Sequence, residues 1–223
     1  MEYFHNTGFI DIETSGLPVK MVPGAKPGTM KKQQLDYETE FMDFPFIVAI
    51  SWAVNDGEPQ EFVLNPEGRI IPKEASDIHG ITTEVAQKSD KKFVDVLPVM
   101  MRDLRETKVV VGHGLYFDTS IIKANVQKGV HGGKITVDHR IGIDDILHKY
   151  KRVDTMRSAA KMCRKWPTLS ELHQKIFRQG FDCHSAAEDV RAVRRCYEWM
   201  LIKGIVPTWE ELQEKAEKKE QMA

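Results

Sequence analysis

The stretch FIDIET, residues 9–14, places two carboxylates inside an apolar run. Asp11 and Glu13 are two positions apart, and alternate residues of a β-strand point to the same face of a sheet. Two carboxylates held side by side in a buried strand repel each other unless a positive charge lies between them. Oxygen ligands of this kind suit Mg²⁺ or Mn²⁺, and pairs of such ions about 4 Å apart cleave phosphodiesters. The pair therefore indicates a metal site, against the alternative of an idle acidic pair at a strand edge.

Two later segments carry further acidic residues next to histidines. Asp118 follows the run VVVGHGLYF, residues 109–117, and taken alone it is most simply a helix-capping aspartate. His184 and Asp189 are five positions apart, which is about 500° on a regular helix, so they cannot share a helix face. We therefore expect His184 in the loop before a helix and Asp189 in the first turn of that helix.

Composition narrows the class of protein. The chain has 223 residues, 41% of them apolar, and a net charge of −1, so no global basic field attracts nucleic acid. The three cysteines form no CxxC pair and leave an odd number, which is typical of a reduced, intracellular protein. No signal peptide and no membrane-spanning apolar run is visible. We expect a soluble, cytoplasmic protein without a membrane partner.

The apolar patterning predicts a layered α/β or α+β domain, with strands early in the chain and helices later. Residues 1–207 are expected to form a single domain, with a flexible, irregular insert at about 19–45 that we interpret as a mobile flap. A second insert is expected at about 128–150, and residues 208–223 form a charged helix or tail. Strands are expected at 9–13, 46–54, 61–64 and 109–112, and helices at 76–88 with a break near Gly80, 93–106, 117–126, 156–165, 169–178 and 185–203.

Five segments, in order and spacing, resemble the DEDDh family of 3′→5′ exonucleases. They are DIETSGL at 11–17, IHGIT at 78–82, HGLYFD at 113–118, VDTM at 153–156 and HSAAED at 184–189. The similarity runs from residue 9 to about residue 200 and so covers most of the chain. It implies an α/β, RNase H-like fold with a mixed five-stranded sheet flanked by helices.

The resemblance also implies a catalytic role for each acidic residue. Asp11, Glu13 and Asp189 are expected to bind Mg²⁺ or Mn²⁺ directly, with Asp11 bridging two ions and Asp118 holding the second ion, often through water. His184 is expected to be the general base, and its ordinary pKa near 6.5 suits that role at neutral pH. One ion would position the attacking hydroxide and the other would stabilise the leaving 3′-oxygen. The product would be a nucleoside 5′-monophosphate.

Four further residues match positions at which the family contacts the 3′ end of its substrate. Thr14 and Leu17 are expected at the terminal nucleotide, with Leu17 between the last two bases, although a core position is the alternative for Leu17. His79 is expected near a phosphate or sugar, or else to cap a turn. Phe117 is expected to stack on a base or to belong to the core. Asp154 is expected to cap the helix that follows it.

The chain departs from the family at residue 114, where a glycine follows His113 and the family often has asparagine. The expected function is a metal-dependent 3′→5′ exonuclease acting on single-stranded or frayed 3′ ends, with DNA favoured as substrate. One alternative is an RNA-directed enzyme of the same family, since contact with the terminal 2′-OH distinguishes the two substrates. Another is a catalytically silent nucleic-acid-binding module, against which the intact acids argue. No feature of the chain indicates a polymerase partner.

Overall fold

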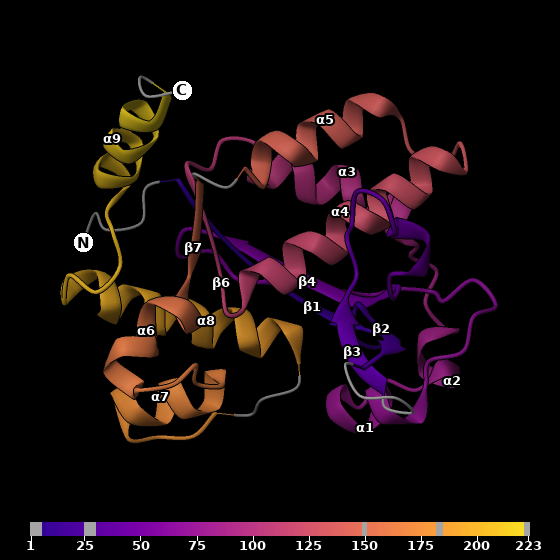
Figure 1. Cartoon of the computed structure of the whole chain (residues 1–223), viewed down its shortest axis with the longest axis horizontal. Helices are drawn as coiled ribbons and strands as arrows, with labels where there is room; N and C mark the ends of the chain where they lie inside the picture. Colours follow the sequence, from indigo (N-terminus) through magenta and orange to yellow (C-terminus); the bar gives the residue numbers. More distant parts are fainter. Residues whose placement is uncertain (1–5, 25–29, 149–150, 182–184, 221–223) are drawn as a thin grey trace.

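A mixed five-stranded sheet forms the centre of the protein (Figure 1). The computed structural model describes residues 6–24, 30–148, 151–181 and 185–220. Within the sheet the strand order is β5-β4-β1-β6-β7, where β1 and β4 pair antiparallel, as do β4 and β5, while β1, β6 and β7 run parallel. The strands are β1 (Thr7–Thr14), β4 (Ile47–Val54), β5 (Gln60–Val63), β6 (Val109–Gly112) and β7 (Arg152–Asp154). The expected α/β architecture with a mixed five-stranded sheet is confirmed.

Helices cover both faces of this sheet, as Figure 1 shows. One face packs against α6 (Thr155–Cys163), α7 (Leu169–Phe177) and α8 (Ala186–Ile202), and the other against α3 (Phe93–Leu104), α4 (Leu115–His131) and α5 (Val137–Ile146). Phe9 belongs to the core on the α8 side, whereas its neighbour Ile10 belongs to the core on the α4 side. Because side chains alternate along β1, Asp11 and Glu13 share the face of Phe9, toward α8.

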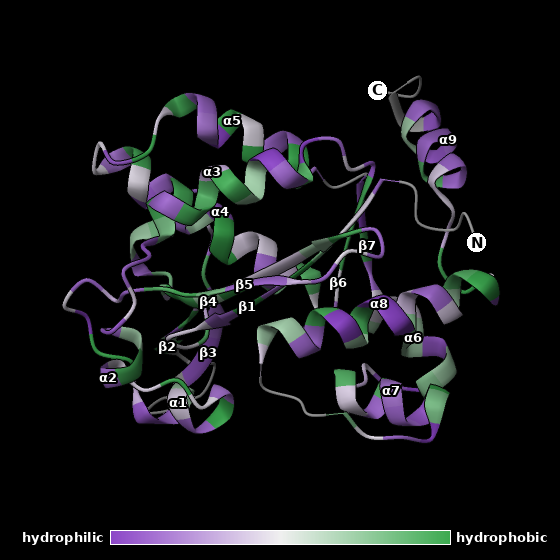
Figure 2. Ribbon diagram, turned by 180° about the vertical axis from the view of Figure 1, so that it is seen from behind, coloured by the Kyte–Doolittle hydropathy of each residue, from purple (hydrophilic) through white to green (hydrophobic). Residues whose placement is uncertain are grey.

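Apolar residues dominate the central strands, whereas the helices mix polar and apolar positions (Figure 2). This pattern is what a sheet buried on both faces and helices with one solvated face require. Phe9, Ile10, Ile50 and Trp52 are fully buried in the two cores. Within the described residues, none of the helices is both long and apolar enough to cross a membrane.

The smaller elements gather beside the end of the sheet at which β1 finishes (Figure 1). They are the hairpin β2 (Val19–Pro23) and β3 (Met30–Gln34), the 3-10 turn η1 (Phe41–Asp43), and the short helices α1 (Lys73–His79) and α2 (Thr83–Ala86). The expected helix break falls at Gly80, which adopts the left-handed φ of 73° that favours glycine. The last helix is α9 (Trp209–Glu220).

The segment 19–45, which was expected to be irregular, contains regular structure, so that expectation is wrong. Residues 19–45 include the antiparallel β2–β3 pair, and the segment is anchored by Leu35 and Phe44, which are buried in the core. The alternation there was obscured by four lysines and by the glycines and prolines between the strands. Residues 128–150 include the end of α4 and the whole of α5. The flap mobility and the domain limits stay predictions.

Candidate active site

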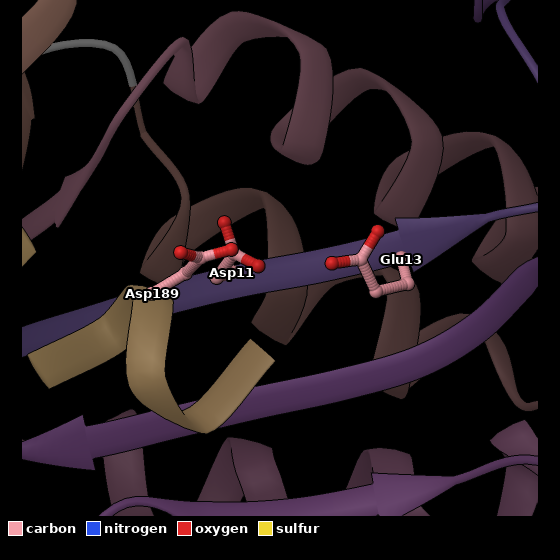
Figure 3. A group of neighbouring side chains, drawn as sticks. All are labelled: Asp11, Glu13 and Asp189. Atoms are coloured by element: carbon pink, nitrogen blue, oxygen red, sulfur yellow. The ribbon is translucent and has the colours of Figure 1, made fainter. Parts of the chain in front are cut away.

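Three carboxylates from two distant parts of the chain converge at the sheet (Figure 3). Asp11 and Glu13 project from β1, and Asp189 projects from the first turn of α8. Each offers one oxygen, and these three oxygens lie within 4.8 Å of one another. Figure 3 shows the Asp11 and Asp189 carboxylates side by side, with the Glu13 carboxylate pointing toward them from further along the strand. Among the described residues this is the single such group of potential metal ligands.

A fourth acid, Asp118, lies in the first turn of α4 and is 4% exposed. It is not the helix cap, because Gly114 occupies the N-cap position with a left-handed φ of 79°. That conformation suits glycine and is tolerated by asparagine, so this departure from the family pattern preserves the local backbone. Asp118 Oδ2 is buried and has no hydrogen-bond partner among the described residues. A buried, unpartnered carboxylate oxygen is costly unless it has a ligand.

The carboxylates raise one another's pKa. Burial raises the pKa of Asp11 well above its ordinary value, and the charges of Asp118 and Asp189 raise it further. Burial, followed by repulsion from Asp189 and Glu61, raises the pKa of Glu13 to about 7. The pKa of Asp118 is also raised, mainly by burial and then by Asp154. Without a cation, burial and mutual repulsion therefore favour the protonated forms of Asp11 and Asp118, and Glu13 titrates near pH 7. A hard divalent cation, bound by carboxylate oxygens, fits this cluster.

Glu61 is a residue of the site that sequence reasoning missed. It lies on β5, and its Oε1 accepts hydrogen bonds from Ser185 Oγ (3.2 Å) and from the backbone N–H of Ala187 (3.1 Å). Ser185 is the N-cap of α8, and its own side chain makes no capping hydrogen bond. Glu61 therefore supplies the missing cap from another strand and holds the helix turn that carries Asp189. A lone glutamate on a short exposed strand gives no local signal of this role.

A pocket of about 530 Å³ lies beside the acidic cluster. It is lined by all four residues expected at the substrate end, Thr14, Leu17, His79 and Phe117, and by Glu13. We call it the Leu17 pocket. Leu17 is 61% exposed, so the core alternative for this residue is wrong. Phe117 is partly buried against the core and also lines the pocket.

Two histidines near the site are held by polar contacts. His79 is buried, and this burial lowers its pKa. Its Nδ1 accepts a hydrogen bond from the backbone N–H of Ile81, which is the turn-capping role given as an alternative for this residue. His113 contacts Thr155 Oγ1 (3.0 Å) and the Pro167 carbonyl oxygen (2.9 Å). His184 lies outside the described residues, so its role as general base stays a prediction.

Asp154 has the structural role that the sequence predicted. It is the N-cap of α6, and its Oδ1 accepts the backbone N–H groups of Met156 (3.0 Å) and Arg157 (3.3 Å). The same oxygen accepts the N–H of Gly114 at 3.0 Å. This second bond ties the start of α6 to the start of α4, where Asp118 lies.

Acidic residues gathered at the centre of an RNase H-like sheet define the class of nucleases that act on phosphodiesters with bound divalent cations. The family model of the RNase T exonucleases matches residues 9–197 of this chain. The chain therefore belongs to this exonuclease family, whose members are phosphodiester hydrolases. A comparison with curated proteins returned no match.

Solved structures of exonucleases share the fold. Exonuclease X in complex with 5′ overhanging duplex DNA is 20% identical, with a TM-score of 0.51 over 92% of this chain and 96% of its own. Exonuclease I of E. coli in complex with a dT13 oligonucleotide is 16% identical, with a TM-score of 0.59 over 87% of this chain and 40% of its own. A 3′-exonuclease described in 3′-end recognition of a histone mRNA stem-loop is 13% identical, with a TM-score of 0.58 over 92% of this chain and 85% of its own. At these identities the likeness establishes the fold.

Proposed function

We propose that the chain is a metal-dependent 3′→5′ exonuclease that releases nucleoside 5′-monophosphates from single-stranded or frayed 3′ ends, with DNA as the favoured substrate. One observation carries this proposal: the oxygens of Asp11, Glu13 and Asp189 lie within 4.8 Å of one another beside an open pocket. The family membership supports the reaction class.

The acidic cluster is the proposed site of Mg²⁺ or Mn²⁺. Asp11, Glu13 and Asp189 would bind the ions, with Asp118 as a fourth acidic neighbour. Divalent cations there supply the positive charge that stabilises the developing negative charge of a phosphodiester under attack. The raised pKa values of Asp11 and Glu13 are the expected property of carboxylates built to face a cation. A catalytically silent module that only binds nucleic acid would not need carboxylates that burial and mutual repulsion destabilise.

The Leu17 pocket is the proposed site of the 3′-terminal nucleotide. Its apolar wall, with the exposed Leu17 and the ring of Phe117, fits a base, and Thr14 offers a hydroxyl near the sugar. Glu13 lines the same pocket, so a nucleotide held there would place its phosphate near the carboxylates. His184 would take the proton of the attacking water. A terminal pocket next to the acids is the reason to expect an exonuclease that acts from the 3′ end.

The choice between DNA and RNA depends on how the pocket accommodates the 2′-OH. DNA is favoured in this proposal, and two of the three similar structures named above were solved with DNA. The third concerns an RNA stem-loop, so the RNA-directed alternative has to be measured directly.

Matched 5′-labelled single-stranded DNA and RNA test the proposal in a gel time course with Mg²⁺ or Mn²⁺. The expected result is a ladder that shortens from the 3′ end, faster on DNA, and that disappears with EDTA or with Asp11→Ala. If RNA is shortened faster than DNA, the protein would instead be an RNA-directed exonuclease. If neither DNA nor RNA is cleaved but DNA is still bound, the protein would instead be a catalytically silent binding module.

A further inference from the structure

A second hollow lies at the same edge of the sheet as the acidic cluster. Strands β1, β6 and β7 run parallel, so their carboxyl ends lie along one edge. The Leu17 pocket adjoins the end of β1, and a hollow of about 320 Å³ adjoins the end of β7. This hollow is lined by Tyr116, Arg152 and Arg157, among others. The proposed function gives it no role.

An arginine lies between two exposed aromatic rings at this hollow. The guanidinium carbon of Arg157 is 6.0 Å from the ring centre of Tyr116 and 5.8 Å from that of Trp166. Tyr116 is 46% exposed and Trp166 is 65% exposed. A tryptophan with two thirds of its surface in water gains little from folding. Flat rings and a guanidinium exposed together form the kind of platform on which nucleic-acid bases stack. We call Tyr116, Arg152, Arg157 and Trp166 the Arg157 surface.

The segment that carries this surface is strongly basic, although the chain as a whole has a net charge of −1. Residues 152–165 contain one acid, Asp154, and five cations: Arg152, Arg157, Lys161, Arg164 and Lys165. Four of the five cations are exposed. A local positive field of this kind attracts a phosphate backbone even where the whole protein is neutral.

The first turn of α4 connects the Arg157 surface to the proposed active site. Tyr116 lines the hollow, the next residue Phe117 lines the Leu17 pocket, and the next, Asp118, raises the pKa of Asp11 in the acidic cluster. Successive helix residues point about 100° apart, so one turn serves all three places. Two hydrogen bonds fix the arrangement: Gly114 N–H to Asp154 Oδ1, and Arg152 to Thr119 Oγ1, at 3.0 and 2.9 Å.

We propose that the Arg157 surface binds the single-stranded part of the substrate that lies 5′ of the scissile phosphodiester, with bases stacked on Tyr116 and Trp166 and phosphates near Arg152 and Arg157. This inference rests on the proposed function, because it assumes that the 3′-terminal nucleotide occupies the Leu17 pocket. The strand then passes the acids and continues along the same edge of the sheet. The surface therefore sets a preference for long strands over dinucleotides.

Kinetics with a long and a short substrate test this assignment. We expect the double variant Arg157→Ala/Trp166→Ala to raise the KM for a single-stranded 20-mer on the order of tenfold with kcat little changed. Cleavage of a dinucleotide should stay as in the wild-type protein, because a dinucleotide does not reach the surface. Arg105→Ala is the matched control, since this exposed arginine follows α3 and precedes the start of β6, at the opposite edge of the sheet.

Binding without cleavage gives a second readout. In an Asp11→Asn background, fluorescence anisotropy of a labelled 20-mer measures affinity as a function of salt. Arg157→Ala should reduce the slope of log K against log[salt] by about 0.7, the value for one lost phosphate contact on a single strand. Trp166→Ala should weaken binding at every salt concentration without changing that slope, because stacking releases no counterions.

The outcomes separate this inference from the proposed function. Unchanged KM and affinity for the 20-mer in the double variant would overturn the assignment of the Arg157 surface, whereas dinucleotide cleavage would still support the exonuclease. An equal rise in KM for 20-mer and dinucleotide would also overturn it, because the residues would then act at the terminal nucleotide. Absence of dinucleotide and 20-mer cleavage by the wild-type protein would instead contradict the proposed function.

Discussion

Glu61 Oε1 accepts the backbone N–H of Ala187 at 3.1 Å, so a side chain of β5 caps the helix that carries Asp189. These two residues are 126 positions apart in the sequence. The same carboxylate raises the pKa of both Asp11 and Glu13 by repulsion. Glu61 is therefore a positioning residue, because it holds the helix turn that carries Asp189. It also adds negative charge near the acidic cluster.

Substitution of Glu61 separates these two effects. Glu61→Ala removes the cap, and we expect the Mn²⁺ affinity, measured by titration calorimetry, to fall roughly fivefold, since the loss of a helix cap costs about 1 kcal/mol. Glu61→Gln keeps an acceptor oxygen and removes the charge, so it should restore most of the affinity and move the pH midpoint of Mn²⁺ binding downward. Glu58→Ala is the control, because Glu58 also pairs with α8, but through Arg191 of its second turn, at 2.9 Å. Equal losses for Glu58→Ala and Glu61→Ala would refute the specific role.

Removal of one carboxylate from the cluster should stabilise the metal-free protein. Asp11→Asn relieves repulsion among Asp11, Asp118 and Asp189, so we expect its Tm in EDTA to rise by a few degrees. The same variant should lose the rise in Tm that Mg²⁺ or Mn²⁺ produces in the wild-type protein, together with its nuclease activity. A lower Tm in EDTA would show that the four acids do not repel one another in the folded state.

The pH dependence of stability follows from Glu13. Its pKa is raised from 4.5 to about 7 in the folded protein, so the stabilising contribution is fully present below about pH 4.5 and is lost as the pH rises through 7. For this group alone the difference is on the order of 3 kcal/mol. We expect the Tm of the metal-free protein to fall between about pH 4.5 and 7 and to level off above that range, and the Tm increase caused by Mn²⁺ to grow over the same range.

Glu13→Gln is the control for this pH effect. The amide does not titrate, so the fall in Tm with pH should become shallower in this variant. An equally steep fall in Glu13→Gln would assign the pH dependence to other groups.

His184 is the predicted general base. His184→Ala should reduce kcat on the order of a hundredfold, while calorimetry should find Mn²⁺ affinity close to that of the wild-type protein. The wild-type pH–rate profile should lose its acidic limb in the variant. Unchanged kcat would remove His184 as the base.

Part of the acidic cluster could be predicted because its signals are local, whereas the grouping of Asp189 with Asp11 and Glu13 was implied by the family resemblance. Alternation along a strand places Asp11 and Glu13 on one face, and Asp189 falls in the first turn of a strongly patterned helix. The roles given to these residues came from a resemblance in order and spacing, and the family match supports that membership.

The features that escaped prediction depend on contacts between distant segments. Strand β7 has three residues, too few for any periodicity to show, and it is defined by its pairing with β6. The capping bond of Glu61 joins β5 to α8, and nothing near Glu61 in the sequence encodes it. The Arg157 surface likewise joins Tyr116 of α4 to residues of β7 and α6.

The central claim is hydrolysis from the 3′ end, and the first product formed from a 3′-end-labelled strand tests it most directly. Single-stranded DNA that carries the label in its last nucleotide is incubated with Mg²⁺ and the wild-type or Asp11→Asn protein, and the products are separated at the earliest time points. The account predicts that the wild-type protein releases the label first as a nucleoside 5′-monophosphate, and that the variant releases none. Release of the label in longer fragments would contradict it, because such fragments arise from internal cleavage or from attack at the 5′ end.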